Sequence, residues 1–182
     1  MISYESLAIR RSNTRWPGYG QPEDYGYDFR EFISPYTKTA GNRDADVMLV
    51  LQDWASHEGL RVRGVDPEIQ RLGHDPTITT NKRLKSLLQR HLGLRLEDTY
   101  GTNAFVFVKP GGMSGNIPMA DVRRSVAEFT VHEVKLVEPR VVLALGARVH
   151  AALTSEGIKA VALPHPAARI SKVAMDEAWG TI

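Results

Sequence analysis

Four short apolar runs constrain what this chain can fold into. They are residues 46–51 (DVMLVL), 102–108 (TNAFVFV), 140–145 (RVVLAL) and the weaker 159–163 (KAVAL). Runs that stay apolar and β-branched without alternating are typical of strands that are buried on both faces. The sequence therefore predicts a sheet that is covered on both sides.

Amphipathic helical patterns occupy segments between these runs. They span residues 80–94, with Gly93 as a C-cap, residues 118–139, beginning at Pro118, and residues 146–157, ending at Gly157. The second pattern predicts a buried stripe made of Val122, Val126, Phe129 and Val134. Strands that alternate with helices favour a parallel sheet with right-handed crossovers. We expect an α/β fold of three layers, α/β/α, around a central four-stranded, mainly parallel sheet.

The first 44 residues have a different composition from the rest of the chain. The stretch TRWPGYGQPEDYGYDF (14–29) is rich in glycine, proline, tyrosine and charge, and it has no sustained periodicity. So many aromatic side chains need a surface to pack against. We therefore expect residues 1–44 to form an irregular arm packed on the core, with a short helix or turn near 29–33. The α/β/α domain then spans residues 45–182.

The composition excludes several classes of protein. The chain has 182 residues, of which 42% are hydrophobic and 24% charged, as in soluble globular proteins. It has no cysteine, which excludes disulfides, a thiolate nucleophile and a cysteine-bound cluster. No apolar run approaches the ~18–20 residues of a membrane helix, and the N-terminus lacks a signal-peptide stretch. We expect a cytoplasmic monomer with no membrane partner; the net charge of +2 is compatible with a polyanionic partner without indicating one.

Polar side chains follow two of the predicted strands where each strand ends. Gln52 and Asp53 come directly after the first run, and His165 follows the fourth run between two prolines. In open parallel sheets the functional site lies outside the carboxyl ends of the strands. The sequence therefore predicts that these three side chains share one edge of the sheet. Asn103, at the start of the second run, is a further candidate for the same pocket.

A carboxylate, a carboxamide and an imidazole suit cleavage of an N-glycosidic bond. The amide reads the edge of a planar base such as uracil, and the imidazole donates to the carbonyl oxygen that gains charge. The carboxylate orients a water toward an oxocarbenium-like sugar. No dinucleotide, P-loop or G-x-S-x-G motif follows a strand. Asp53, His57 and His165 lack the spacing of known metal sites, so we expect no metal ion and no cofactor.

Four segments between residues 44 and 172 resemble motifs of the uracil-DNA glycosylase superfamily in order and spacing. They are VMLVLQDWAS (47–56), YGTNAFVFVKPGGMSGNIP (100–118), VEPRVVLALGARVHAAL (137–153) and PHPAARIS (164–171). The cysteines that bind an iron–sulfur cluster in the thermophilic-type enzymes are absent. The chain therefore looks like a divergent branch, and the resemblance implies a base-excision repair hydrolase that acts on uracil in single- or double-stranded DNA.

The resemblance implies a role for each matched position. Asp53 would activate the water and His165 would stabilise the leaving base. The backbone amides of Gln52 and Asp53 would contact the base, and Asn103 would read its Watson–Crick edge. Without the resemblance, Asp53 can equally be a helix cap and His165 a turn residue bonded to a carbonyl.

The chain departs from the family pattern around the expected base. Trp54 and Ala55 stand where the family has Pro-Tyr, and that tyrosine excludes thymine. Thr77 holds the place of the phenylalanine that stacks on uracil, so we expect base stacking to come from Trp54 or to be weak. Trp54 can equally be a core residue.

A second set of residues is expected to contact the DNA backbone. The glycine-rich loop 109–117 lets backbone amides approach a phosphate closely. Arg169 occupies the place of the leucine that fills the gap left by the flipped nucleotide. The predicted DNA-binding residues are Lys109, Gly112, Ser114, Arg169 and Lys172.

Other functions remain open at this level. Ala55 and Thr77 leave room for another deaminated base, hypoxanthine or xanthine. The chain can also be a catalytically inactive module that binds damaged DNA, or a small-molecule hydrolase built on a similar sheet. No nucleophilic lysine is evident at the pocket, so we expect a monofunctional enzyme without strand scission by a Schiff base.

Overall fold

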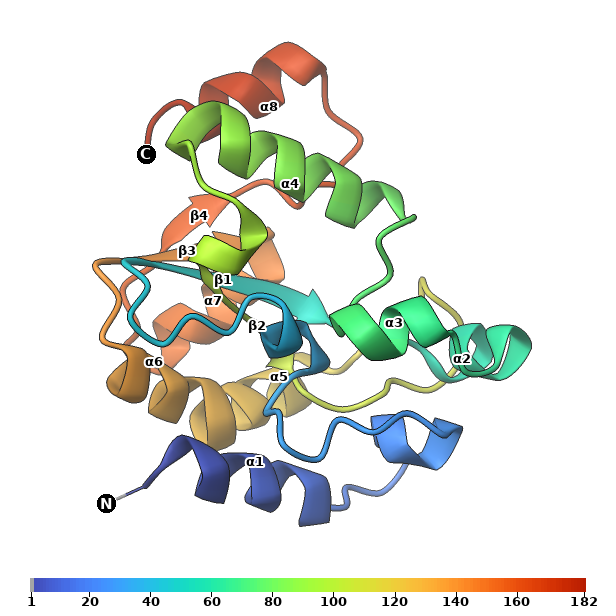
Figure 1. The fold of residues 1–182 in the computed structure, drawn as a ribbon. Helices are drawn as coiled ribbons and strands as arrows, with labels where there is room; N and C mark the ends of the chain where they lie inside the picture. Colours follow the sequence, from blue (N-terminus) through green and yellow to red (C-terminus); the bar gives the residue numbers. More distant parts are fainter. Residues whose placement is uncertain (1) are drawn as a thin grey trace.

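The computed structural model describes residues 2–182 and contains one four-stranded sheet (Figure 1). The strands are β1 (Val47–Asp53), β2 (Tyr100–Phe105), β3 (Val141–Leu145) and β4 (Val161–Leu163). They run parallel in the order β2-β1-β3-β4. The predicted three-layer α/β/α class with a parallel sheet is confirmed.

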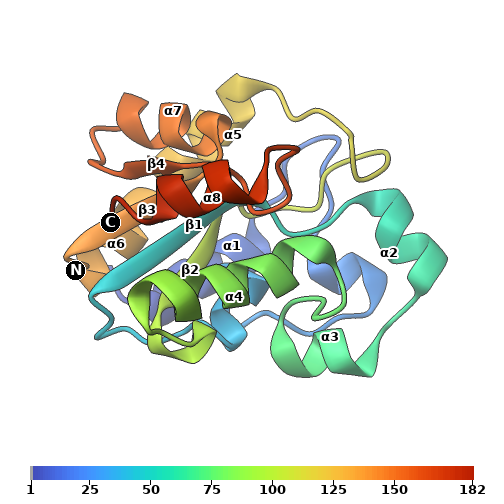
Figure 2. The same ribbon diagram turned by 90° about the horizontal axis from the view of Figure 1, so that it is seen from above.

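Two helical layers cover the sheet, as the unbroken apolar runs predict (Figures 1 and 2). Helices α4 (Thr79–Leu92) and α8 (Lys172–Trp179) lie on one face. Helices α5 (Met119–Ser125), α6 (Val131–Val137) and α7 (Ala147–Ser155) lie on the other. Alternate residues of β1 serve the two cores: Met48 and Val50 pack with the α5–α7 layer, and Leu49 and Leu51 pack with α4 and α8.

Helix α4 follows its sequence pattern closely. Leu84, Leu87 and Leu88 are buried on one stripe. Gly93 adopts the left-handed conformation (φ 65°), and its N–H donates to Gln89 O. The predicted C-cap is therefore confirmed.

The long helical pattern that begins at Pro118 contains a π-helical turn, η4 (Val126–Thr130), between α5 and α6. Val122, Val126 and Phe129 are buried as predicted, whereas Val134 is only partly buried. Glu133 is fully buried instead, because it follows Phe129 by four residues and therefore lies on the same buried face of the helix. Hydroxyl groups of the sheet solvate its carboxylate: Tyr100 donates over 2.7 Å and Thr102 over 3.1 Å.

Strand β2 begins and ends earlier than its apolar run. Residues 106–108 leave the sheet while staying buried, and Val108 pairs with Gly20 in an isolated antiparallel bridge. Asn103 is consequently an interior residue of β2, in register with Leu51. Phe105, not Asn103, is level with Asp53 at the carboxyl edge.

The first 44 residues contain a helix that the sequence reading did not predict, α1 (Tyr4–Asn13), and the 3-10 turns η1 (Pro22–Tyr25) and η2 (Pro35–Lys38). A capping box at Ser3 starts α1. Trp16 packs on Phe107, with ring centroids 4.6 Å apart, so aromatic residues of this segment join the core beside α5. The Arg11 guanidinium is fully buried and donates to Gln21 Oε1 (2.8 Å), to Glu23 and to backbone carbonyls of the arm.

Two short helices that the sequence reading also missed lie beyond the carboxyl end of β1: α2 (His57–Arg63) and α3 (Pro67–Leu72) (Figures 1 and 2). Ser56 and Asp66 cap them by accepting backbone N–H groups. A 3-10 turn, η3 (Leu96–Asp98), precedes β2. Within residues 2–182, no helix has the length and apolar character needed to cross a membrane.

Candidate active site

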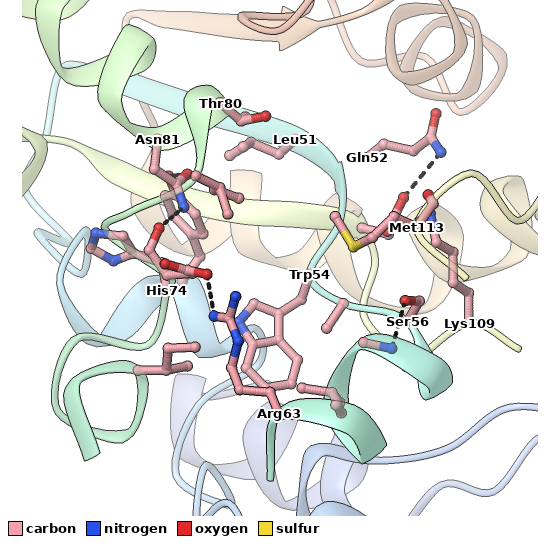
Figure 3. A pocket seen from close by; sticks show the side chains of 18 of the residues that line it. Leu51, Gln52, Trp54, Ser56, Arg63, His74, Thr80, Asn81, Lys109 and Met113 are labelled. Carbon is pink, nitrogen blue, oxygen red and sulfur yellow. Dashed lines mark hydrogen bonds and ion pairs between the residues drawn. The ribbon is translucent and has the colours of Figure 1, made fainter. Parts of the chain in front are cut away.

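A cavity of about 520 Å³ opens at the carboxyl edge of the sheet. Residues of the β1 end, α2 and the Lys109–Met113 segment form one side of it, and residues from α3 to the first turn of α4 form the other (Figure 3). His165 reaches the cavity from the segment after β4. The predicted residues on its wall are Gln52, Asp53, Trp54, Lys109 and His165.

Asp53, the last residue of β1, has a partner on each carboxylate oxygen. Oδ1 accepts a hydrogen bond from Gln52 Nε2 (3.0 Å), and Oδ2 lies 3.0 Å from Lys109 Nζ. The Asp53 side chain is 12% exposed and that of Lys109 5%. Asp53 is therefore a nearly buried carboxylate whose counter-ion lies inside the same cavity.

Lys109 is not the exposed phosphate contact that the sequence predicts. After β2 the chain runs beside the extension of β1, where Lys109 N donates to Ala55 O and His57 N donates to Lys109 O (2.9 Å). This pairing turns the lysine side chain inward, and Nζ also donates to Met113 O (2.6 Å). A buried ammonium with two partners does not face a DNA backbone.

His165 lies in the segment that follows β4, and Asp53 is close enough to affect its pKa. The backbone N–H of Ala167 donates to His165 Nδ1 (3.1 Å), so the proton of the neutral ring is on Nε2. Burial lowers the pKa of His165 below its ordinary value of 6.5, and the Asp53 charge opposes this shift in part. At neutral pH the ring is therefore an uncharged donor through Nε2.

Trp54 forms a fixed apolar wall. Its indole Nε1 donates to Gly73 O (2.9 Å), and its ring meets Tyr27 and Phe29 edge-on, with centroids 5.5 Å apart in each case. Each of these contacts holds the ring in place from outside the cavity. Trp54 is therefore both a packing residue and part of the pocket lining.

Two predicted base-binding residues lie outside the cavity lining. Asn103 is 1% exposed within β2, and its Oδ1 accepts from Ser34 Oγ (2.6 Å). Its Nδ2 has no hydrogen-bond partner among residues 2–182. Thr77 is exposed, and both its N–H and its hydroxyl donate to Asp75 Oδ1. The stacking position suggested by the resemblance is thus occupied by an exposed turn residue that does not line the cavity.

The predicted DNA-binding residues other than Lys109 have different surroundings. Arg169, Lys172 and Ser114 are exposed. A Cβ on Gly112 would lie 2.9 Å from Glu58 Oε2, which brings a carboxylate against the glycine-rich loop. Positive charge is therefore presented by the segment after His165 rather than by this loop.

Residues that sequence reasoning did not assign to the site form its second wall. Tyr36 donates to Asn81 Oδ1 (2.6 Å), and Asn81 Nδ2 donates to Asp75 O (2.6 Å). Asp75 forms an ion pair with Arg63, and His74 packs against the Tyr36 ring with centroids 5.2 Å apart. Burial raises the pKa of Tyr36 and lowers that of His74, so both side chains are uncharged at neutral pH.

The sequence contains one signal for this wall. Asn81 stands within DPTITTNKRL, the stretch that resembles the stacking motif of the glycosylases. Tyr36 and Arg63 lie in segments without periodicity or motif, and only the path of the chain brings them to the cavity. Within residues 2–182, no group of three or more histidine, aspartate and glutamate side chains is arranged to hold a metal ion.

Neither a family model nor a curated protein matches this chain in sequence. The cavity combines a nearly buried acid paired with a lysine, a neutral histidine donor and a wall of aromatic and amide groups.

Proposed function

We propose that the protein hydrolyses the N-glycosidic bond of uracil in DNA, with the flipped nucleotide held in the cavity at the strand ends. One observation carries the proposal: Asp53 from β1 and His165 from beyond β4 line the same cavity. An acid and an uncharged imidazole donor facing one ligand suit a reaction that builds positive charge on a sugar and negative charge on a departing base.

His165 stabilises the departing base in this proposal. Because the Ala167 N–H donates to Nδ1, the single N–H proton of the neutral His165 ring is on Nε2 and can be donated to the base. A neutral donor matches the forming uracil anion without transferring its proton to it, because the imidazole N–H is a far weaker acid than the imidazolium. The ring is partly buried, and a bound base would exclude further water and strengthen the hydrogen bond.

Asp53 orients the attacking water. Its two oxygens each keep a free lone pair beside the contacts to Gln52 and Lys109, so a water can still donate to it. The Lys109 ammonium beside Asp53 weakens the attraction between the carboxylate and a positively charged sugar. The acid acts here mainly by positioning the water.

Specificity for the base comes from the walls of the cavity. Trp54 offers an apolar surface, and Ala55 leaves open the position where the resembling family carries tyrosine. The buried amide of Asn103 lies in the sheet beside Leu51 and outside the cavity lining, so it does not contribute to this specificity.

A second candidate is release of another deaminated base, hypoxanthine or xanthine. The cavity of about 520 Å³ lies within the range of pockets that hold drug-sized ligands, and it accommodates a nucleoside with either one or two rings. The small side chain of Ala55 on its wall favours this candidate.

The test is release of free base from oligonucleotides that carry one uracil, hypoxanthine, xanthine or thymine, each single- and double-stranded. We expect uracil release by the wild type and by Asp44→Asn, an exposed control far from the cavity. We expect at least 100-fold slower release by His165→Gln. Tight binding without release would indicate an inactive module, and no DNA affinity at low salt would indicate a small-molecule hydrolase.

A further inference from the structure

Lys109 is the one lysine on the cavity wall among residues 2–182. Its Nζ lies 3.0 Å from Asp53 Oδ2 and 2.6 Å from Met113 O, and its side chain is 5% exposed. From the sequence we expected no nucleophilic lysine at the pocket and therefore no strand scission through a Schiff base. Because Lys109 lies on the cavity wall, this reaction is no longer excluded.

We propose that Lys109 gives the pocket a second activity, in which its amine forms a Schiff base with the aldehyde of an abasic deoxyribose and the strand is cleaved by β-elimination. The substrate class is DNA that contains an abasic site, which is the product of base release. The inference rests on the proposed function in one respect: the sugar must enter the pocket beside Asp53.

The amine must first lose a proton, and Asp53 is the acceptor within reach. Oδ2 faces Nζ directly, so the transfer needs no intervening water. In the proposed sequence Asp53 first orients the water for base release and then accepts the lysine proton, which supplies the neutral amine that the second reaction requires.

The reaction is balanced without an oxidant or a metal ion. The Nζ lone pair adds to C1′ of the ring-opened sugar, the carbonyl π electrons move to its oxygen, and that oxygen takes the proton held by Asp53. Loss of one water gives the C=N bond of the protonated Schiff base. The Asp53 carboxylate then removes a C2′ proton, the C–H electrons form a C=C bond, and the 3′ phosphate leaves with the C3′–O electrons.

The short distance between Asp53 and Lys109 lets both groups act on the same sugar carbon in this proposal. In the proposed reaction Asp53 orients a water toward C1′, and an atom 3.0 Å from its Oδ2 is within reach of that carbon. The Lys109 ammonium also donates to Met113 O (2.6 Å), which helps to hold it at the cavity wall.

The experiment uses DNA with a preformed abasic site, so that it does not depend on base release. The full-length protein is incubated with this DNA and sodium borohydride, which reduces a Schiff base to a stable amine. Covalent protein–DNA product is measured on a denaturing gel, and the attached residue is identified by peptide mass spectrometry. Variants are Lys109→Arg and Lys109→Met, with Lys159→Arg as the control at the opposite end of the sheet.

We expect an adduct on Lys109 in the wild type, an unchanged yield in Lys159→Arg, and at least tenfold less adduct in both Lys109 variants. Mapping in the wild type keeps the test valid if a Lys109 variant fails to fold. No adduct, or an adduct on another amine, overturns the inference. Uracil release without a trapped adduct would support the proposed function and overturn the strand-cleaving activity. A trapped adduct on Lys109 without uracil release would overturn the proposed function and support the strand-cleaving activity.

Discussion

Lys109 Nζ and Asp53 Oδ2 form an ion pair of 3.0 Å inside the cavity, although one residue ends β1 and the other follows β2. The pair is nearly buried, unlike ion pairs on the surface of the molecule, such as Arg140–Asp46. A buried charge is tolerated when its partner is present and becomes a large penalty when the partner is removed. Function and stability are therefore coupled at this pair.

The first prediction concerns that coupling. Asp53→Asn leaves the Lys109 ammonium buried without an anion, so we expect the free energy of unfolding to fall by about 3–5 kcal/mol. Lys109→Met leaves the opposite charge unpaired and is expected to act similarly. The double variant should lose much less than the sum of the two. Urea denaturation of all four proteins measures this coupling energy.

A double-mutant cycle on Asp46 and Arg140 provides the matched control, because both side chains of that ion pair are exposed. Its coupling energy is expected to be near zero. Additive effects of Asp53→Asn and Lys109→Met would mean that the two side chains do not interact in solution.

The second prediction concerns the tautomer of His165. The Ala167 N–H bond predicts a neutral ring protonated on Nε2, with a pKa below 6.5 because burial disfavours the charged form. The unfolded chain binds this proton more tightly, so His165 makes folding less favourable as the pH falls below 6.5. Nitrogen-15 spectra of labelled histidine rings, assigned with His165→Gln, measure both properties. A ring protonated on Nδ1 at pH 7 would remove the proposed donor.

The third prediction concerns Glu133. Burial raises the pKa of this carboxyl group from 4.5 to about 7. Between these values the folded protein binds the proton more tightly than the unfolded chain. Its stabilising effect is therefore complete below pH 4.5 and is lost as the pH rises through 7. Glu133→Gln keeps an acceptor for Tyr100 and has no charge to bury, so we expect it to be more stable than the wild type at pH 8, by about 3 kcal/mol.

Unfolding midpoints at pH 5 and pH 8 test this expectation. Glu97→Gln, at an exposed site, is the matched control and should follow the wild type at both values. If Glu133→Gln is less stable than the wild type at pH 8, the carboxylate is accommodated in its charged form.

The fourth prediction concerns DNA affinity. Arg169 and Lys172 are exposed beyond His165, where they can meet phosphates. Changing either to alanine should weaken binding to the same extent for uracil-containing and undamaged DNA. It should also reduce the slope of log K against log salt by about 1. Fluorescence anisotropy titrations at several salt concentrations measure both effects, with Lys135→Ala on α6 as the control.

Much of the fold could be predicted because it depends on local pattern. Apolar runs and helical stripes identified all four strands and the long helices, and the parallel topology follows from their alternation. The helices that were not predicted, α1 to α3 and α8, are short or have weak apolar stripes. The burial of Glu133 was not predicted, because its carboxylate is buried only with hydroxyl partners. These partners, Tyr100 and Thr102, lie on a strand that is distant in the sequence.

The sequence by itself determined which residues meet at the carboxyl edge of the sheet. Parallel strands end on the same side, so a residue at the end of β1 and one beyond β4 must share that edge, and this brings Asp53 and His165 together. Strand register and the course of the loops decided the rest. They place Asn103 inside the sheet, leave Thr77 outside the cavity lining and bring Lys109 to Asp53. Such contacts depend on how segments that are distant in the sequence pack against one another, and local periodicity does not predict that packing.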